Sequence, residues 1–143
     1  MATPAQDRKL RDPSLNPGDQ PYFDACAEGK LLIKKCGDCG KVHHYPRALC
    51  PHCFSGKVDW LQTKGTGVIY TYSVTRRGGP VPYAIGYVTL DEGPKMMTNF
   101  VDCDLDALKI GQKVKVVFKK TENGSSVPSG QLPVAFSAAI HRR

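Results

Sequence analysis

The sequence predicts a mainly β protein, in which a short N-terminal helix and a small metal-binding ribbon precede a five-stranded barrel. Four of the six cysteines form two C-x-x-C pairs within "CGDCGKVHHYPRALCPHC", residues 36–53. After residue 65, short apolar segments alternate with turn residues, and no long helical pattern interrupts them. The 143 residues suffice for one domain, or for one domain and a small module. We expect an arm at 1–18, the helix and ribbon at 19–60, and the barrel at 61–143.

Two features at the N-terminus predict an arm followed by a helix. Residues 1–18 are polar, contain three prolines and show no apolar periodicity, which is typical of a flexible arm. Residues 19–29, "DQPYFDACAEG", read as a short helix that Asp19 caps and Gly29 terminates. Cys26 falls on its apolar face, and we interpret it as a small core residue.

Six segments read as strands. "KLLIKK", residues 30–35, leads into the first cysteine pair. In the first barrel segment Val68, Tyr70, Tyr72 and Val74 alternate, and we interpret this face as core. In "KVKVVFKK" the apolar residues are expected inside the barrel and the lysines outside: Val114, Val116 and Phe118 against Lys113, Lys115 and Lys119. The five barrel strands are expected at "TGVIYTYSVT" (66–75), "YAIGYVTL" (83–90), "KMMTNFVDC" (95–103), "KVKVVFKK" (113–120) and "LPVAFSAAI" (132–140), with "ENGSSVPSG" (122–130) as a turn.

The cysteine pairs predict a structural zinc site. Each C-x-x-C turn presents two sulfurs to one side of an ion, and two such turns complete the tetrahedral shell that zinc prefers. The predicted ligands are Cys36, Cys39, Cys50 and Cys53. Such a shell leaves no position for water, so the metal is expected to be structural. Iron in a rubredoxin-like site and a redox dithiol stay open as alternatives, since spacing alone does not separate them.

The residues around the cysteines are expected to support the shell. Gly40 suits the tight backbone after the first pair, whereas Phe54 stands at the corresponding place after the second. With four cysteines available, we interpret His43, His44 and His52 as surface or second-shell residues rather than ligands.

The sequence gives little support for catalysis or for a membrane. Cys103 lies between Asp102 and Asp104, whose charges would raise the pKa of its thiol, so we expect an inert thiol. G-x-S-x-G, phosphate-loop and H-E-x-x-H motifs are missing from the sequence. No apolar run reaches the roughly 18–20 residues that span a bilayer. The N-terminus also lacks a secretory signal, so we expect a cytoplasmic protein, in which paired cysteines more often bind metal than form disulfides.

The basic excess points to partners that carry phosphate. The formal charge is +7, and four thiolates on a zinc dication reduce it to about +5. Basic residues near the cysteines form one candidate rim for a phosphorylated cofactor: Lys34, Lys35, Lys41 and Arg47. Single-stranded nucleic acid is the alternative, through Tyr70, Tyr72, Tyr83 and Tyr87 beside Arg76–Arg77. The interpretation of Tyr70 and Tyr72 as core residues weakens this alternative.

The order of these motifs resembles a known family. "YFDACAEGKL", "KCGDCGKVHHYPRALCPHC", "GTGVIYTYSVT", "PYAIGYVTLDEGPKMMTNFVD" and "LKIGQKVKVVF" follow one another as in small proteins with a rubredoxin-like zinc ribbon and an OB-fold, often encoded beside thiolases. The resemblance covers roughly residues 20–140. The missing glycine after Cys53 and an extended "TENGSSVPSG" loop depart from the family pattern.

The resemblance implies a non-catalytic accessory subunit of a thiolase-type acyl-CoA enzyme. Members of this family associate with thiolases, hydroxymethylglutaryl-CoA synthases, or acyl-CoA hydratases and aldolases. In the thiolase case the large partner is expected to supply the nucleophilic cysteine and the general base, while the small chain orders the complex and helps to bind coenzyme A. Some thiolase partners act in the degradation of aromatic compounds and others in that of steroid side chains. The basic rim of Lys34, Lys35, Lys41 and Arg47 would suit the phosphates of CoA. A nucleic-acid-binding adaptor is the alternative function, and an independent acyl-CoA carrier or thioesterase is a third.

Overall fold

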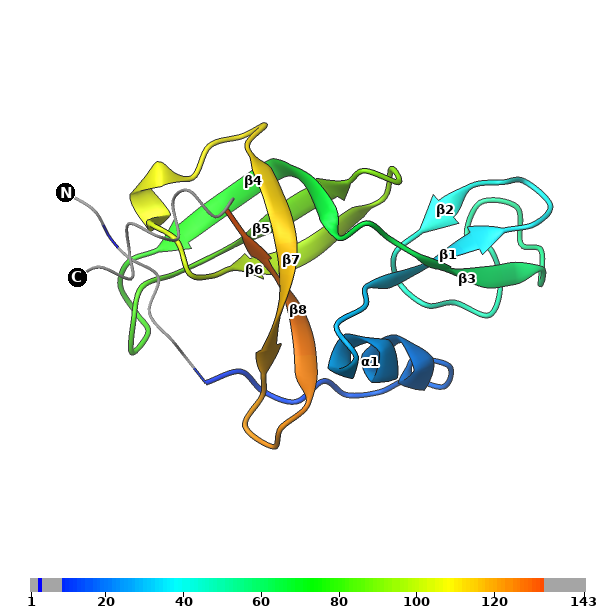
Figure 1. The fold of residues 1–143 in the computed structure, drawn as a ribbon, viewed down its shortest axis with the longest axis horizontal. Helices are drawn as coiled ribbons and strands as arrows, with labels where there is room; N and C mark the ends of the chain where they lie inside the picture. Colours follow the sequence, from blue (N-terminus) through cyan, green and yellow to red (C-terminus); the bar gives the residue numbers. More distant parts are fainter. Residues whose placement is uncertain (1–2, 4–8, 133–143) are drawn as a thin grey trace.

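The chain folds as a small ribbon beside a closed barrel (Figure 1). The structure is a computed structural model that describes residues 3 and 9–132. The elements in order are α1 (Gln20–Ala27), β1 (Leu32–Cys36), β2 (Val42–His43), β3 (Val58–Gln62), β4 (Thr66–Thr75), β5 (Tyr83–Leu90), β6 (Lys95–Phe100), the 3-10 helix η1 (Leu105–Ala107), β7 (Lys113–Lys120) and β8 (Ser126–Gln131). The prediction of a mainly β protein with one N-terminal helix, a ribbon and a five-stranded barrel is confirmed.

The two sheets have different topologies. The ribbon sheet is antiparallel with strand order β2-β1-β3, and the barrel closes in the order β4-β5-β6-β8-β7. Closure depends on one parallel register pair, Phe100 with Gly130. A Cβ at Gly130 would lie 3.3 Å from the Phe100 ring, so the missing side chain lets the two strands approach.

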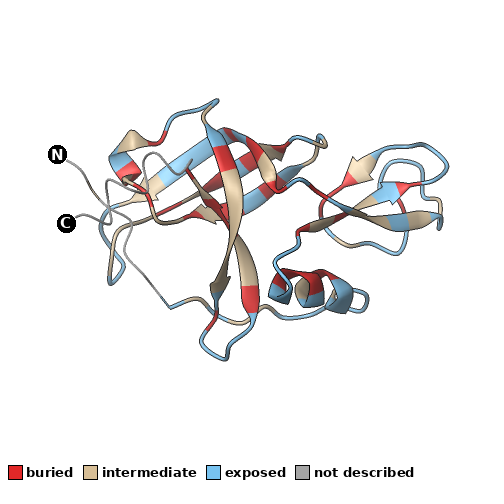
Figure 2. Cartoon of the chain, viewed as in Figure 1, coloured by how far each residue is buried: buried red, intermediate tan, exposed pale blue. Residues whose placement is uncertain are grey.

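One hydrophobic core joins the ribbon, the helix and the barrel. Leu31, just before β1, and Ile33, within it, are buried in the same cluster as Tyr22 and Cys26 of α1 and Ile69 of β4. Helix α1 packs on β1 and β8, and buried positions continue from the helix into the barrel strands (Figure 2). The interpretation of Cys26 as a core residue is therefore confirmed.

The connection between ribbon and barrel is hydrogen-bonded on both sides. The backbone N–H and the hydroxyl of Thr63 both donate to the Leu31 carbonyl, at 2.9 and 3.0 Å. The Gly65 N–H donates to the Thr63 hydroxyl at 3.1 Å, and the Val116 N–H donates to the Gly65 carbonyl at 2.7 Å. Residues 63–65 are thus anchored to β1 on one side and to β7 on the other.

The ends of α1 differ in part from expectation. Gly29, with φ +79°, follows the helix as predicted. Asp19 occupies the N-cap position, but its carboxylate accepts the Asn16 N–H at 2.9 Å and makes no cap bond to the helix. The prediction that the Asp19 side chain caps the helix is wrong because the carboxylate is used by the preceding turn.

Three of the four β4 residues that were predicted to face inward face outward instead, whereas Val74 packs against the core as predicted. Ile69 is buried, whereas Val68, Tyr70 and Tyr72 are exposed. A bulge between Ile69 and Thr71 interrupts the pairing with β5. Both faces of this segment carry apolar side chains, so the sequence pattern does not decide which face is buried. A shift of one residue exchanges the core face and the solvent face.

The last described strand also differs from the prediction. β8, Ser126–Gln131, lies in the stretch that was expected to be a turn and a family-atypical loop. Pro128 pairs with Phe118 of β7, while β6 meets β8 only at Gly130, so the missing proline N–H leaves no partner unsatisfied. Of the strand expected at 132–140, only the buried Leu132 lies within the described residues.

Strand β7 packs into the barrel core, and the N-terminal arm lies against the barrel surface. In β7, Val114 is buried, and Val116 and Phe118 pack against the core, as predicted. The described residues 9–18 of the N-terminal arm lie beside the β7–β8 turn. There the Glu122 N–H donates to the Leu10 carbonyl at 3.0 Å, and Asp12 accepts from Thr121.

Candidate metal centre and adjoining cleft

The four cysteines converge on one point at the far end of the ribbon. Their Sγ atoms all lie within 4.8 Å of one another, with Cys36 and Cys53 at 3.6 Å and Cys39 and Cys50 at 3.7 Å. A tetrahedron with metal–sulfur bonds of about 2.3 Å has edges of about 3.8 Å. The observed sulfur spacing therefore fits a tetrahedral four-thiolate ion.

Backbone N–H groups favour negative sulfur at this site. The Cys39 N–H points at Cys36 Sγ at 3.5 Å, and the His52 N–H points at Cys50 Sγ at 3.4 Å. The Cys39 N–H is the main cause that lowers the pKa of Cys36 to about 6. The Ser55 backbone lowers the pKa of Cys53, but burial and the neighbouring sulfurs prevail and raise it to about 12. Four sulfurs this close cannot all ionise without a cation, which is the role of a bound dication.

The two knuckles have the same backbone shape despite their different sequences. The Gly40 N–H donates to the Cys36 carbonyl at 3.0 Å, and the Phe54 N–H donates to the Cys50 carbonyl at 2.8 Å. Gly40 has φ +74° and Phe54 has φ +64°. The missing glycine therefore does not alter the fold of the second knuckle. Phe54 occupies a left-handed conformation that costs a non-glycine residue about 1–2 kcal/mol.

The three histidines do not share one environment. His52 is exposed, but His43 and His44 are buried, so of the two expected roles, surface or second-shell, the surface role does not apply to these two. His44 Nε2 lies 3.1 Å from the Tyr22 hydroxyl, and burial, with His43 nearby, lowers the pKa of His44 to about 4. Neither ring nitrogen of His43 has a hydrogen-bond partner within the described part of the chain.

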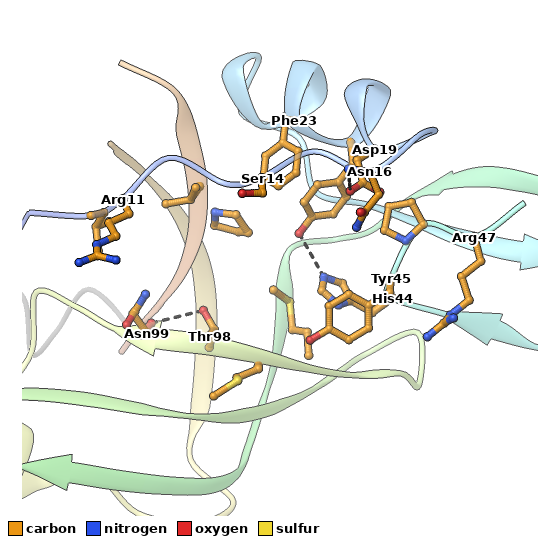
Figure 3. Close-up of a pocket in the computed structure, with 17 residues that line it drawn as sticks. Arg11, Ser14, Asn16, Asp19, Phe23, His44, Tyr45, Arg47, Thr98 and Asn99 are labelled. Atoms are coloured by element: carbon orange, nitrogen blue, oxygen red, sulfur yellow. Dashed lines mark hydrogen bonds between the residues drawn. The ribbon is translucent and has the colours of Figure 1, made fainter. Parts of the chain in front are cut away.

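A cleft of about 640 Å³ separates the ribbon loop from the barrel (Figure 3). Its walls come from the arm at 9–18, from α1, from the loop after β2, and from β6 and β8. Met96, Met97 and Pro128 line it from the barrel side, and Tyr22 and Phe23 from the helix. Figure 3 shows Arg11 at one end and Arg47 at the other. The volume lies in the range of small-molecule sites, with apolar walls and a few polar groups.

The structure divides the predicted basic rim into two places. Lys34 Nζ donates to the Arg47 carbonyl at 3.2 Å and lies 4.6 Å from the centre of the Trp60 ring. Lys35 and Lys41 line a separate, open hollow between the ribbon and the β5–β6 turn. The division follows from strand alternation, because neighbouring residues of β1 face opposite sides. Of the four residues, only Arg47 lines the cleft.

Sequence reasoning missed Arg11 and the cleft itself. Arg11 lies in a stretch without periodicity, and no local pattern indicates that it lies at the opposite end of the cleft from Arg47. The buried pair of Tyr22 and His44 was missed for the same reason, since its members are separated by 22 residues.

The two cysteines outside the cluster are poor nucleophiles. Cys26 and Cys103 are buried. Burial raises the pKa of Cys103 to about 11, with smaller effects from Asp104 and Asp102, and burial alone raises that of Cys26 to about 11. The expectation of an inert thiol at Cys103 agrees with this environment, although burial and not the carboxylates is its main cause.

No helix in the described ranges, residue 3 and 9–132, has the length and apolar character to cross a membrane.

A four-cysteine ribbon followed by a five-stranded barrel of OB topology defines the class of this protein. Comparison with family models is specific: residues 23–59 match the "ChsH2, rubredoxin-like zinc ribbon domain" and residues 60–119 match the "ChsH2, C-terminal OB-fold domain". The chain belongs to this ChsH2 (DUF35) family of zinc-ribbon and OB-fold proteins, which confirms the resemblance that the sequence suggested.

Several relatives cover much of the chain. A DUF35 domain-containing scaffold protein of Methanothermobacter thermautotrophicus is 38% identical over 96 residues, 63% of this chain and 72% of the relative. A probable enoyl-CoA hydratase alpha subunit of Thermomonospora curvata is 30% identical over 120 residues, which are 81% of this chain. This chain spans only 38% of the length of that hydratase subunit.

Two solved structures share the fold. A chain of an "Ltp2-ChsH2(DUF35) aldolase" superposes with a TM-score of 0.75 at 30% identity, over 85% of this chain and 98% of the other. A DUF35 protein of unknown function from Sulfolobus solfataricus superposes with a TM-score of 0.61 at 16% identity, over 82% and 87% of the two chains. Its sequence similarity is low, so it supports the fold alone.

The first prediction concerns the metal. The purified protein should contain about one zinc per chain, because the four sulfurs fit one tetrahedral ion. Cys39→Ser should lose the metal and unfold the ribbon, since short metal ribbons depend on their ion. Trp60 on β3 is the only tryptophan, so its fluorescence reports on the ribbon and should shift to the red. Cys103→Ala, which changes a cysteine outside the cluster, should keep the zinc; zinc loss in both variants would contradict the assignment.

The second prediction concerns the second knuckle. Phe54 is 77% exposed, so Phe54→Gly removes little packing and relieves the left-handed strain. It should raise the free energy of unfolding by about 1 kcal/mol, measured by urea denaturation of the zinc-loaded protein. Phe54→Ala keeps a Cβ at the strained position and is the matched control, which should gain nothing. Equal stability of the glycine and alanine variants would show that the backbone there is unstrained.

The third prediction concerns pH. The pKa of His44 falls from 6.5 to about 4 on folding, so the folded state binds fewer protons than the unfolded state between these values. Stability should therefore decrease as the pH is lowered through this window, by about 1 kcal/mol at pH 5.5. His44→Gln keeps a hydrogen bond to Tyr22 without the titration, so its stability should approach that of the wild type from pH 7.5 to 5.5. A constant difference in urea denaturation at the two pH values would exclude this origin.

Proposed function

We propose that this chain is a non-catalytic accessory subunit of an enzyme that acts on acyl-CoA. The observation that carries the proposal is the pairing of a metal shell filled by four sulfurs with a preformed cleft that has an arginine at each end. A filled shell gives the ion no position for substrate or water. Within the described residues, the two cysteines outside the shell are buried with raised pKa values, so the reaction is assigned to a partner.

The names of relatives support this proposal. The Methanothermobacter protein is called a scaffold protein, the Thermomonospora protein a probable enoyl-CoA hydratase subunit, and the superposed chain belongs to an aldolase. We infer that the partner of this chain is a larger subunit of the same broad class, acting on an acyl-CoA. Within that class a thiolase is the choice that the family resemblance favours, and an aldolase or hydratase is the choice that these names favour.

The cleft is the proposed CoA site. CoA carries a diphosphate and a 3′-phosphate at one end and an apolar pantetheine arm, so it needs cations near apolar walls. Arg47 and Arg11 supply the cations, and Met96, Met97 and Phe23 supply the walls. Lys34 contributes by holding the Arg47 backbone in place. Lys35 and Lys41 face the other hollow, so their share in CoA binding is proposed to be smaller.

Breakdown of aromatic compounds or of steroid side chains is the proposed context, by analogy with the family. The cytoplasm is the proposed location, because its reducing conditions keep the four thiols available to a metal.

A nucleic-acid-binding adaptor is the second candidate. One observation favours it: Tyr70, Tyr72 and Tyr87 are exposed and not in the core, so their rings are accessible to bases. Salt-dependent binding of a labelled oligonucleotide would distinguish it.

The test is reconstitution. The chain is co-expressed with each thiolase-, aldolase- or hydratase-type subunit encoded near its gene, and acyl-CoA turnover is measured with and without it. We expect the partner to need this chain for full activity. Arg47→Ala and Arg11→Ala should weaken acyl-CoA binding by the complex by roughly 10-fold or more, as expected for lost charge-assisted hydrogen bonds. Lys41→Ala is the control that should change it little. Full activity of every partner alone would overturn the proposal.

A further inference from the structure

We propose that the outer face of strands β4, β5 and β6 is the surface on which the catalytic subunit docks, and that the partner's matching surface has an apolar centre and an acidic rim. This inference rests on the proposed function and adds to it the site and the chemistry of the contact. We call this surface the outer sheet face; its central residues are Val68, Tyr70, Tyr87 and Met97.

Strand register brings these side chains together. The buried residues of β5 and β6 alternate with the exposed ones, so Tyr87 and Met97 both point away from the core. They are direct cross-strand partners. Thr71 is the partner of Tyr87 on β4, and the bulge beside it carries Tyr70. Tyr70 is 52% exposed, Met97 47% and Tyr87 44%, which is unusual for three neighbouring large side chains.

The rest of the described chain covers other surfaces. Helix α1 packs on β1 and β8, and residues 9–18 lie beside the β7–β8 turn. Figure 2 shows exposed segments along β4 and β5. Tyrosine and methionine are also residue types enriched at the centres of protein interfaces.

Lysines border this apolar centre. Lys95 Nζ lies 4.8 Å from the centre of the Tyr70 ring. Lys113 of β7 is the register partner of Val68, and Lys115 is that of Thr66. The acidic residue at this border, Asp91, accepts a hydrogen bond from the Thr66 hydroxyl. A complementary partner therefore carries carboxylates around its apolar contact, which also steers association.

The outer sheet face continues into the proposed CoA cleft. Met97 belongs to the face and also lines the cleft, together with its strand neighbour Asn99. A subunit seated on β4–β6 would thus extend to the mouth of the cleft. A ligand held there would then lie between the two chains, where the partner's reactive groups can reach its acyl end.

The geometry of the outer sheet face favours a protein partner over single-stranded nucleic acid. Base stacking needs free aromatic ring faces. The Lys95 ammonium already covers one face of the Tyr70 ring. Lys113 and Lys115 lie on one border of the face and not between the aromatic residues. This arrangement suits the rim of a protein interface better than a groove that follows a nucleic-acid backbone.

The test compares variants of the face in the reconstituted complex. Tyr87→Thr with Met97→Thr keeps residues that favour strands but removes the apolar centre. Binding of the catalytic subunit, measured by titration calorimetry, should weaken about 30-fold or more, as for interface hot spots. Lys95→Glu should slow association and reduce its salt dependence. Leu49→Ser, which changes an exposed apolar residue of the ribbon, is the matched control and should bind like the wild type. Thermal unfolding of each variant checks that the barrel is intact.

Each outcome decides the question. If the wild-type complex forms and the double variant binds equally well, the docking surface is wrong while the proposed function stands. Equal weakening by Leu49→Ser would also overturn the assignment of this face. If the wild type binds none of the candidate subunits, both proposals fail. If fluorescein-labelled oligo(dT) binds the wild type at physiological salt and the double variant abolishes that binding, the face is a nucleic-acid site instead.

Discussion

The attraction of four sulfurs to a single ion is the constraint on which the cleft depends. The ribbon sheet has two strands of five residues and one of two, too little to persist without a crosslink. The metal site joins the end of β1 to the long loop after β2. That loop carries His44, Tyr45 and Arg47 to the cleft. A metal ion bound by these four sulfurs would therefore position one wall of the proposed ligand site without touching the ligand.

The parts of the fold that local chemistry determines were predictable. The C-x-x-C turns predict the ribbon because a chelating turn needs only neighbouring residues, and "KVKVVFKK" predicts its own inward face. The prediction is wrong for Val68, Tyr70 and Tyr72 because "VIYTY" offers apolar side chains on both faces, and only the narrow barrel interior selects Ile69 over the tyrosines. β8 is not predicted by its sequence because proline and glycine, here Pro128 and Gly130, are uncommon inside strands, and the strand tolerates them through its sparse pairing with β6.

In the candidate site, too, local sequence predicts some features and not others. The four ligands follow from spacing, and the φ of Phe54 shows that the knuckle shape prevails over the preference of a residue. The cleft does not follow from spacing, because it is assembled from segments that lie more than 100 positions apart along the chain, such as the arm and β8. Of the basic residues, Arg47 is placed at the cleft and Lys35 away from it by alternation along β1 and by the loop fold, neither of which composition reveals.

The hydrogen-bonded connection at residues 63–65 has a mechanical consequence. Hinges in proteins are short segments whose backbone torsions are free to change, and this one has its donors and acceptors bound to β1 and to β7. The ribbon and barrel therefore move as a unit, and the width of the gap between them is preset. A molecule that enters meets walls already in place and loses little free energy to their ordering. Any gating then comes from the part of the loop after β2 that carries Arg47, or from the N-terminal arm, and not from a swing of the ribbon.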